Sequence, residues 1–75
     1  MDVRIGVTDL PREIAIELPD DADRDAIKAS IEAAIAGESV TLWLTDVSGR
    51  EIAIASAKIA FAEVGPEGGN PIGFG

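Results

Sequence analysis

Apolar and polar residues alternate in two runs near the start of the chain. The run "DVRIGV" at residues 2–7 places Val, Ile and Val on one side, and "REIAIEL" at residues 12–18 repeats the pattern with Ile, Ile and Leu. A period of two is typical of strands with one buried face. Asp9 and Pro11 lie between the runs and are common turn residues. The pattern therefore predicts a β-hairpin.

The period changes to that of a helix after Pro19. Apolar residues now recur three and four positions apart, which is the spacing of one helix face. This face carries Ile27, Ile31, Ala34 and Ile35. Asp21 is the predicted N-cap, because its carboxylate can accept from the free amides of the first turn. Gly37 is predicted to end the helix in the left-handed conformation.

Alternation with a period of two returns after the helix. In the run "VTLWLT", Val40, Leu42 and Leu44 share one face, and Trp43 lies on the other between two threonines. The turn sequence "DVSG" follows at residues 46–49. Two further strands are predicted at residues 50–55 and 58–64, separated by a short break at Ser56 and Ala57.

The predicted element order is ββαβββ, which places the chain in the α+β class. One helix packed on one face of a mainly antiparallel sheet is the simplest arrangement that buries every apolar stripe. Residues 1–65 are predicted to form a single domain, and residues 66–75 a tail rich in glycine and proline. A chain of 75 residues buries only about 60% of the surface of its unfolded form, so its core is thin.

The composition excludes several classes of function. The chain has no cysteine and no histidine, so we expect no disulfide, no metal site and no bound cofactor. Its net charge of −8 repels nucleic acids and anionic membrane surfaces. No signal peptide and no apolar run of membrane-spanning length is evident. We therefore expect a cytoplasmic protein.

The stretch "AKIAFAEVG" at residues 57–65 is apolar on both faces when read as a strand, with Ile59 and Phe61 on one side and Ala60, Ala62 and Val64 on the other. Trp43 adds a large aromatic side chain to a face that a helix-covered sheet should leave polar. Exposed aromatic residues of this size usually contact something. The leading hypothesis is a non-enzymatic module that self-associates, as a dimer, or binds a protein partner. The predicted interface contains Trp43, Ala53, Ala55, Ala60, Ala62 and Phe74.

Three alternatives stay open. In the first, the tail folds back within one chain and covers Trp43 with Ile72 or Phe74. In the second, the protein binds a small ligand or a nucleotide with a polar set at the strand ends and the glycine-rich tail, although no P-loop is present. This set consists of Asp46, Arg50, Lys58 and Glu63. In the third, an enzyme completes its site across a subunit interface.

Two longer segments, "VRIGVTDLPREIAIE" and "LTDVSGREIAIASAKIAFAEVG", together with the terminal "GFG", resemble a small actinobacterial family catalogued as domain of unknown function 3107. The resemblance covers nearly the whole chain, and the chain departs from the family pattern at "PEGGNP". The resemblance implies one small domain and a cytoplasmic location, and it assigns no mechanism. The family pattern maps onto Arg12, Glu13, Asp46, Gly49, Arg50, Lys58, Phe61, Glu63, Gly65 and Phe74.

Overall fold

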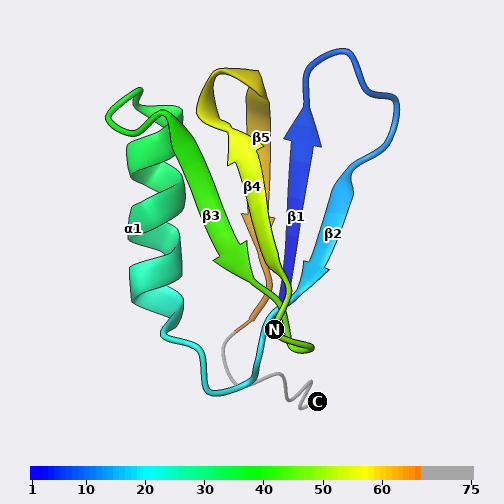
Figure 1. The fold of residues 1–75 in the computed structure, drawn as a ribbon, viewed down its shortest axis with the longest axis vertical. Coiled ribbons are helices and arrows are strands. Elements are labelled where there is room, and N and C mark those ends of the chain that lie inside the picture. The colour runs from blue at the N-terminus through cyan, green and yellow to red at the C-terminus, as the bar shows by residue number, and fades with distance from the viewer. Residues whose placement is uncertain (67–75) are drawn as a thin grey trace.

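A computed structural model describes residues 1–66 of the chain and confirms the ββαβββ order (Figure 1). Its elements are β1 (Asp2–Val7), β2 (Ile14–Glu17), α1 (Arg24–Ile35), β3 (Thr41–Thr45), β4 (Glu51–Ala55), the 3₁₀ turn η1 (Ser56–Lys58) and β5 (Ile59–Val64). Every strand pairing is antiparallel, and the hairpin of β1 and β2 forms as the sequence predicts. The α+β class is therefore confirmed.

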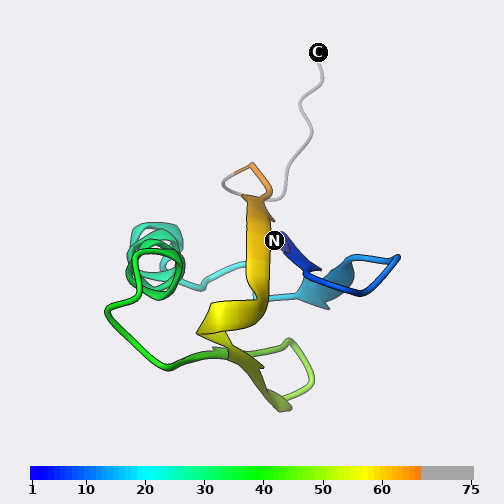
Figure 2. The ribbon, with the colours of Figure 1, turned by 90° about the horizontal axis from the view of Figure 1, so that it is seen from above.

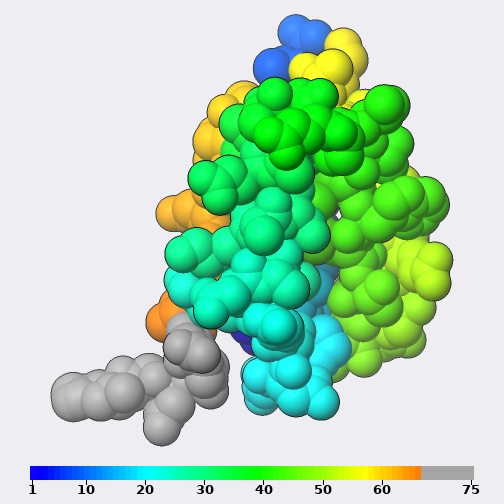
Figure 3. All heavy atoms as spheres, turned by 90° about the vertical axis from the view of Figure 1, so that its left-hand side faces the viewer, coloured from blue at the N-terminus to red at the C-terminus, as the bar shows by residue number. Residues whose placement is uncertain are grey.

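The five strands divide between two sheets. One sheet has the order β2-β1-β5, and the other is a two-stranded ribbon of β3 and β4, here called the ribbon. Seen from above, α1 lies beside β5, and the ribbon lies on a different side of the three-stranded sheet from the helix (Figure 2). In the space-filling view, α1 covers the side of the molecule between β5 and β3 (Figure 3). The helix thus closes the gap between the two sheets.

The core lies where these three layers meet. Alternate residues of β1 and β3 point into it, and α1 contributes its apolar side. Its buried apolar residues are Met1, Val3, Ile5, Ile16, Leu18, Ile31, Ala34, Leu42, Leu44 and Ile54. The buried apolar positions of β1, β2, β3 and β4 are those that the period of two predicts.

The predicted N-cap of the helix is wrong. Asp23, and not Asp21, caps α1, with its carboxylate accepting from the amide of Ala26 at 3.1 Å. The amide of Ala22 donates to the carbonyl of Pro19, so the chain first makes a turn and the helix begins after it. Asp23 has the extended backbone that a capping residue needs.

The predicted end of the helix is confirmed at Gly37, which has a φ of 83°. The amide of Gly37 donates to the carbonyl of Ala34 at 3.1 Å, and that of Glu38 donates to Ala33 at 2.8 Å. These two bonds form a Schellman motif, in which a left-handed residue satisfies the last free carbonyls. Glycine adopts this conformation without steric cost.

Two apolar residues that the pattern places in the core are exposed instead. Ile35 is 54% exposed, because the buried arc of α1 runs from Ile31 toward Ala34. At 3.6 residues per turn, Ala34 lies about 60° to one side of Ile31, and Ile35 about 40° to the other. Val40 is 87% exposed, because β3 begins after it, at Thr41, and the alternation does not extend to it.

The predicted faces of β5 are also wrong, because the strand contains an irregularity. Val7 pairs with Ile59, but the next residue back, Gly6, pairs with Phe61, so Ala60 is an extra residue on β5. Such a bulge reverses the side to which the following residues point. Residues packed against the core from this strand are Ile59, Ala62 and Val64, whereas Phe61 points the other way.

Phe61 lies over the backbone of the neighbouring strand. A Cβ added to Gly6 would stand 2.1 Å from Cε2 of the Phe61 ring, which is far inside van der Waals contact. Because Gly6 has no side chain, the Phe61 ring can occupy the space above it. The ring remains 45% exposed while it covers this part of β1. A contact within its own sheet thus partly covers this aromatic side chain.

We expect Ile31→Ala to lower the free energy of unfolding by about 2–5 kcal/mol, because the change removes buried methylene groups and leaves a cavity. The matched control is Ile35→Ala on the same helix, which should cost less than about 1 kcal/mol, since Ile35 is exposed. Urea unfolding followed by circular dichroism measures both. Equal losses in the two variants would contradict the helix packing described above.

We expect Gly6→Ala to destabilise the protein by about 1–3 kcal/mol, because the new methyl group displaces the Phe61 ring. In the Phe61→Ala background the same change should be neutral or stabilising, since alanine reduces the entropy of the unfolded chain by about 0.4–1 kcal/mol relative to glycine. A double-mutant cycle of unfolding free energies measures this coupling. Additive effects would show that ring and glycine do not interact.

Candidate functional site

The turn between β3 and β4 is a tight loop closed by Asp46 and Arg50. The amide of Asp46 donates to the carbonyl of Arg50 at 2.8 Å, and the amide of Gly49 donates to the carbonyl of Asp46 at 2.9 Å. Gly49 has a φ of 90°. A three-residue loop with glycine in the left-handed position is a common hairpin connection. The sequence "DVSGR" thus encodes the turn locally.

The Asp46 carboxylate organises this turn. Its Oδ1 accepts from the amide and hydroxyl of Ser48 at 2.9 and 2.8 Å and from the amide of Arg50 at 2.8 Å. Its Oδ2 accepts from Nε of Arg50 at 2.7 Å. The hydrogen bond from Ser48, followed by that from Arg50, holds the pKa of Asp46 well below its ordinary value of 3.8, against the opposing effect of burial. Asp46 is only 6% exposed, so this carboxylate is committed to the turn.

Glu17 joins this turn to the three-stranded sheet. Its carbonyl accepts from the amide of Val47 at 2.8 Å. Its carboxylate accepts from the amino group of Met1 at 3.1 Å, and this hydrogen bond raises the pKa of the amino group above 8.0 against the effect of burial. The hydrogen bond from Val47 thus links the turn of the ribbon to the end of β2.

The predicted ligand-binding set does not come together as one site. Asp46 and Arg50 form an ion pair at one end of β4. Lys58 lies in η1, which follows the other end of that strand. Glu63 lies on β5, in the other sheet. The strands that carry these residues therefore distribute them over three places.

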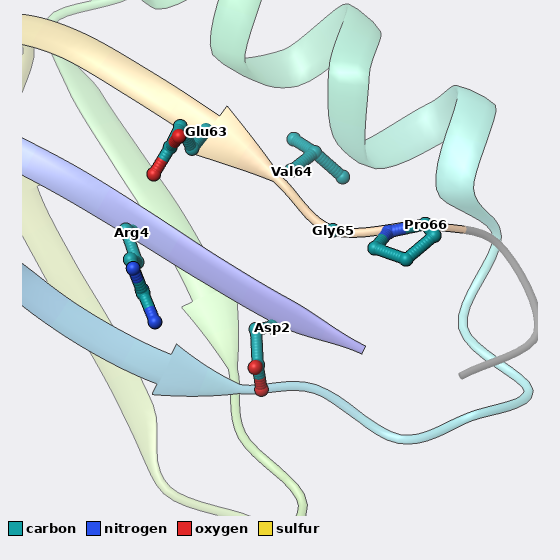
Figure 4. Close-up of a pocket in the computed structure, with 6 residues that line it drawn as sticks. All are labelled: Asp2, Arg4, Glu63, Val64, Gly65 and Pro66. Carbon is teal, nitrogen blue, oxygen red and sulfur yellow. The ribbon is translucent and has the colours of Figure 1, made fainter. Parts of the chain in front are cut away.

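Glu63 does line a shallow cavity of about 330 Å³ at the ends of β1 and β5 (Figure 4). Asp2, Arg4 and Glu63 point to the same side of the sheet there, and Arg4 stands directly opposite Glu63 in the register. Two carboxylates and one guanidinium line the cavity, so its charged side chains carry opposite signs. No group of three or more potential metal ligands occurs within residues 1–66. The sequence analysis missed Asp2 and Arg4, although they alternate with buried Val3.

The side of the ribbon away from the core forms a largely uncharged surface, here called the outer ribbon face. Trp43 lies at its centre, is 62% exposed, and pairs directly with Ala53. Beside this pair, Thr41 pairs with Ala55. The residues of the outer ribbon face are Thr41, Trp43, Thr45, Glu51, Ala53 and Ala55. Only one of them is charged.

The other residues of the predicted interface do not join this surface. Ala62 packs against the core, because the bulge in β5 turns it inward. Ala60 is exposed at that bulge, in the three-stranded sheet and not in the ribbon. Phe74, and with it the alternative that Ile72 or Phe74 covers Trp43, lies outside the described residues. The structure thus groups three of the six residues: Trp43, Ala53 and Ala55.

A groove of about 300 Å³ borders the outer ribbon face, between α1 and β3. Small side chains of the helix form one wall and Trp43 stands on the other. Its lining residues are Ser30, Ala33, Ser39, Thr41, Leu42 and Trp43. The sequence analysis missed this groove, although Ser30 and Ala33 lie three apart on one side of the helix.

Comparison with known proteins gives a family and no activity. The family model described as "Protein of unknown function (DUF3107)" matches residues 1–75. No curated protein matches the chain. Among residues 1–66, no helix has the length and apolar character needed to cross a bilayer.

We expect Asp46→Asn to lower the unfolding temperature at pH 7, because the neutral amide cannot keep both the ion pair to Arg50 and the donors of Ser48. Since folding lowers the pKa of Asp46, its contribution is present above the unfolded pKa of about 3.9 and is lost as the pH falls toward the folded pKa. The difference between wild type and variant should therefore shrink below about pH 4.

Thermal unfolding followed by circular dichroism between pH 2.5 and 7 measures this difference. Asp21→Asn is the control, because it removes the same charge from an exposed aspartate. A difference that stays constant over the whole pH range would contradict the role given to the Asp46 carboxylate.

Proposed function

The chain belongs to the DUF3107 family, and we propose that it is a non-enzymatic association module that binds a second copy of itself through the ribbon of β3 and β4, which carries the outer ribbon face. The observation that carries this proposal is the exposure of Trp43 at the centre of that face. Tryptophan is enriched among the residues that dominate binding energy at protein interfaces. A chain without cysteine also fits the cytoplasmic location that we propose with this function.

The distribution of charge supports a second copy as the partner. Each copy carries a net charge of −8, with six basic and fourteen acidic residues in 75, so two copies repel each other at long range. Contact between them is least costly where like charges do not meet. The outer ribbon face has Glu51 as its one charged residue, at the edge of the patch. An apolar contact there adds little electrostatic cost.

The ligand-binding alternative has weaker support. Its four residues lie in three separate places, and the acceptors of Asp46 are used within the turn. Glu63 lines a cavity without the other three residues of the set, and Arg50 already pairs with Asp46. We therefore retain self-association as the proposed function.

Sedimentation equilibrium over about 1–300 µM tests the proposal, a range chosen because small interfaces give micromolar affinities. We expect a dimer at the upper end. Trp43→Lys should be a folded monomer, since an unpaired charge buried in a contact is costly. Leu10→Lys is the matched control, because Leu10 is also an exposed large apolar residue but lies outside the ribbon, and it should still dimerise.

Fluorescence gives a second readout, because Trp43 is the single tryptophan of the chain. Its emission should shift to the blue at high protein concentration and to the red on dilution. A wild-type protein that stays monomeric at 300 µM contradicts the proposal. Emission that is independent of concentration, but shifts to the red when residues 66–75 are deleted, would instead favour cover of Trp43 within one chain.

A further inference from the structure

The four sheet edges in residues 1–66 differ in how well they are covered. The edges of β5 and β3 both lie on the side of the molecule that α1 covers (Figures 2 and 3). β2 is also an edge strand, and the turn of the ribbon reaches one end of it, where the carbonyl of Glu17 accepts from the amide of Val47. β4 pairs with β3 alone and lies on the side of β3 away from the helix (Figure 1). An uncovered edge strand presents free peptide groups to another chain.

The ladder of the ribbon determines which peptide groups of β4 are free. Hydrogen bonds join Asp46 to Arg50 at one end and Ser56 to Val40 at the other. Because bonded and non-bonded pairs alternate in an antiparallel ladder, Ile52 and Ile54 bond to β3. The N–H and C=O groups of Glu51, Ala53 and Ala55 therefore point to the open edge. The side chains of these three residues are exposed.

We infer that two copies pair through this edge, with their β4 strands antiparallel about a two-fold axis at Ala53. This inference rests on the proposed self-association and specifies which part of the ribbon meets the second copy: the edge of β4, with Trp43 of each copy beside the contact on the outer ribbon face. The two ribbons then form one four-stranded sheet, in the order β3-β4-β4-β3. Both Trp43 side chains lie on the same face of that sheet, flanking the alanines at its centre.

The register follows from the free peptide groups. With Ala53 opposite Ala53 of the second copy, Glu51 stands opposite Ala55, so all three outward-facing residues of each strand form bonded pairs. A register centred on Ile52 or Ile54 would leave one of the three unpaired. The register on Ala53 also places each glutamate opposite a small neutral residue. Like charges directly opposite each other would be destabilising.

Residues 51–55 carry few of the features that protect natural edge strands, and the charge of Glu51 at one end is the exception. The segment "EIAIA" contains no proline and no lysine, and the small alanines leave its outer side flat. Proline, lysine and inward-pointing charges commonly block unwanted pairing at such edges. Their absence from β4 is consistent with an edge that pairs.

Disulfide cross-linking tests this register, because the chain has no cysteine of its own. In a bonded antiparallel pair the two Cα atoms are about 5.5 Å apart, which is within the range that a disulfide bridges. Ala53→Cys should therefore form a covalent dimer when the full chain at about 100 µM is oxidised with diamide. Within a dimer the effective concentration of one thiol near the other is about millimolar, which is about ten times the protein concentration. The rate of disulfide formation should therefore exceed the rate from random collisions by about tenfold.

Two matched variants control this experiment. Ala55→Cys lies on the same strand and face, but its two copies would be about 14 Å apart in the proposed register and should not cross-link above the collision rate. Ala15→Cys lies on β2, in the other sheet, and gives the collision rate itself. All three changes replace an exposed alanine by a residue of similar size, and circular dichroism confirms that each variant folds.

Rapid cross-linking of Ala53→Cys alone supports the pairing. Equal or faster cross-linking of Ala55→Cys overturns the register. If no variant cross-links above the rate of Ala15→Cys while the wild type dimerises in sedimentation, edge pairing is wrong and face-to-face packing of the outer ribbon faces remains. A wild type that is also monomeric at 300 µM overturns both the pairing and the proposed function.

Discussion

A two-stranded ribbon has two faces, and residues 1–66 cover only one of them. Leu42, Leu44 and Ile54 fill the inner face of the ribbon and lie in the core. The single helix is used to close the gap between the ribbon and the three-stranded sheet. No further layer among residues 1–66 is left for the outer face, where Trp43 lies. The thin core and the exposed aromatic residue thus have the same cause.

Hydrogen bonds within the turn of the ribbon, and one from the turn to β2, hold the ribbon in position. The Asp46 carboxylate satisfies three donors of the turn and pairs with Arg50, which fixes the conformation of residues 46–50. The amide of Val47 then binds the carbonyl of Glu17 at the end of β2. A buried carboxylate with this many partners is a structural group. Asp46 and Arg50, two of the four residues predicted to bind a ligand, therefore hold the turn of the ribbon in position.

The apolar character of both faces of β5 does not have the same cause as the exposure of Trp43. The bulge at Ala60 turns Ala62 and Val64 toward the core and leaves Phe61 on the opposite side, over Gly6. Most of the apolar surface of this strand is therefore used within one chain. The ribbon carries the largest exposed aromatic side chain among the described residues, Trp43, and β4 is an edge strand whose outward-facing residues are exposed. Both features point to the same part of the molecule.

The sequence alone determined the elements, their order, the hairpin and the Gly37 cap, because each depends on local periodicity or on backbone conformation. It also identified Trp43, Ala53 and Ala55 as one face, since alternation within a hairpin is local. The tertiary structure decided that Asp23 caps the helix, that Ile35 is exposed and that Ala62 faces the core. Those outcomes depend on a preceding turn, on the direction in which the helix packs, and on a bulge in the pairing with β1. None of these is encoded in the period of the sequence.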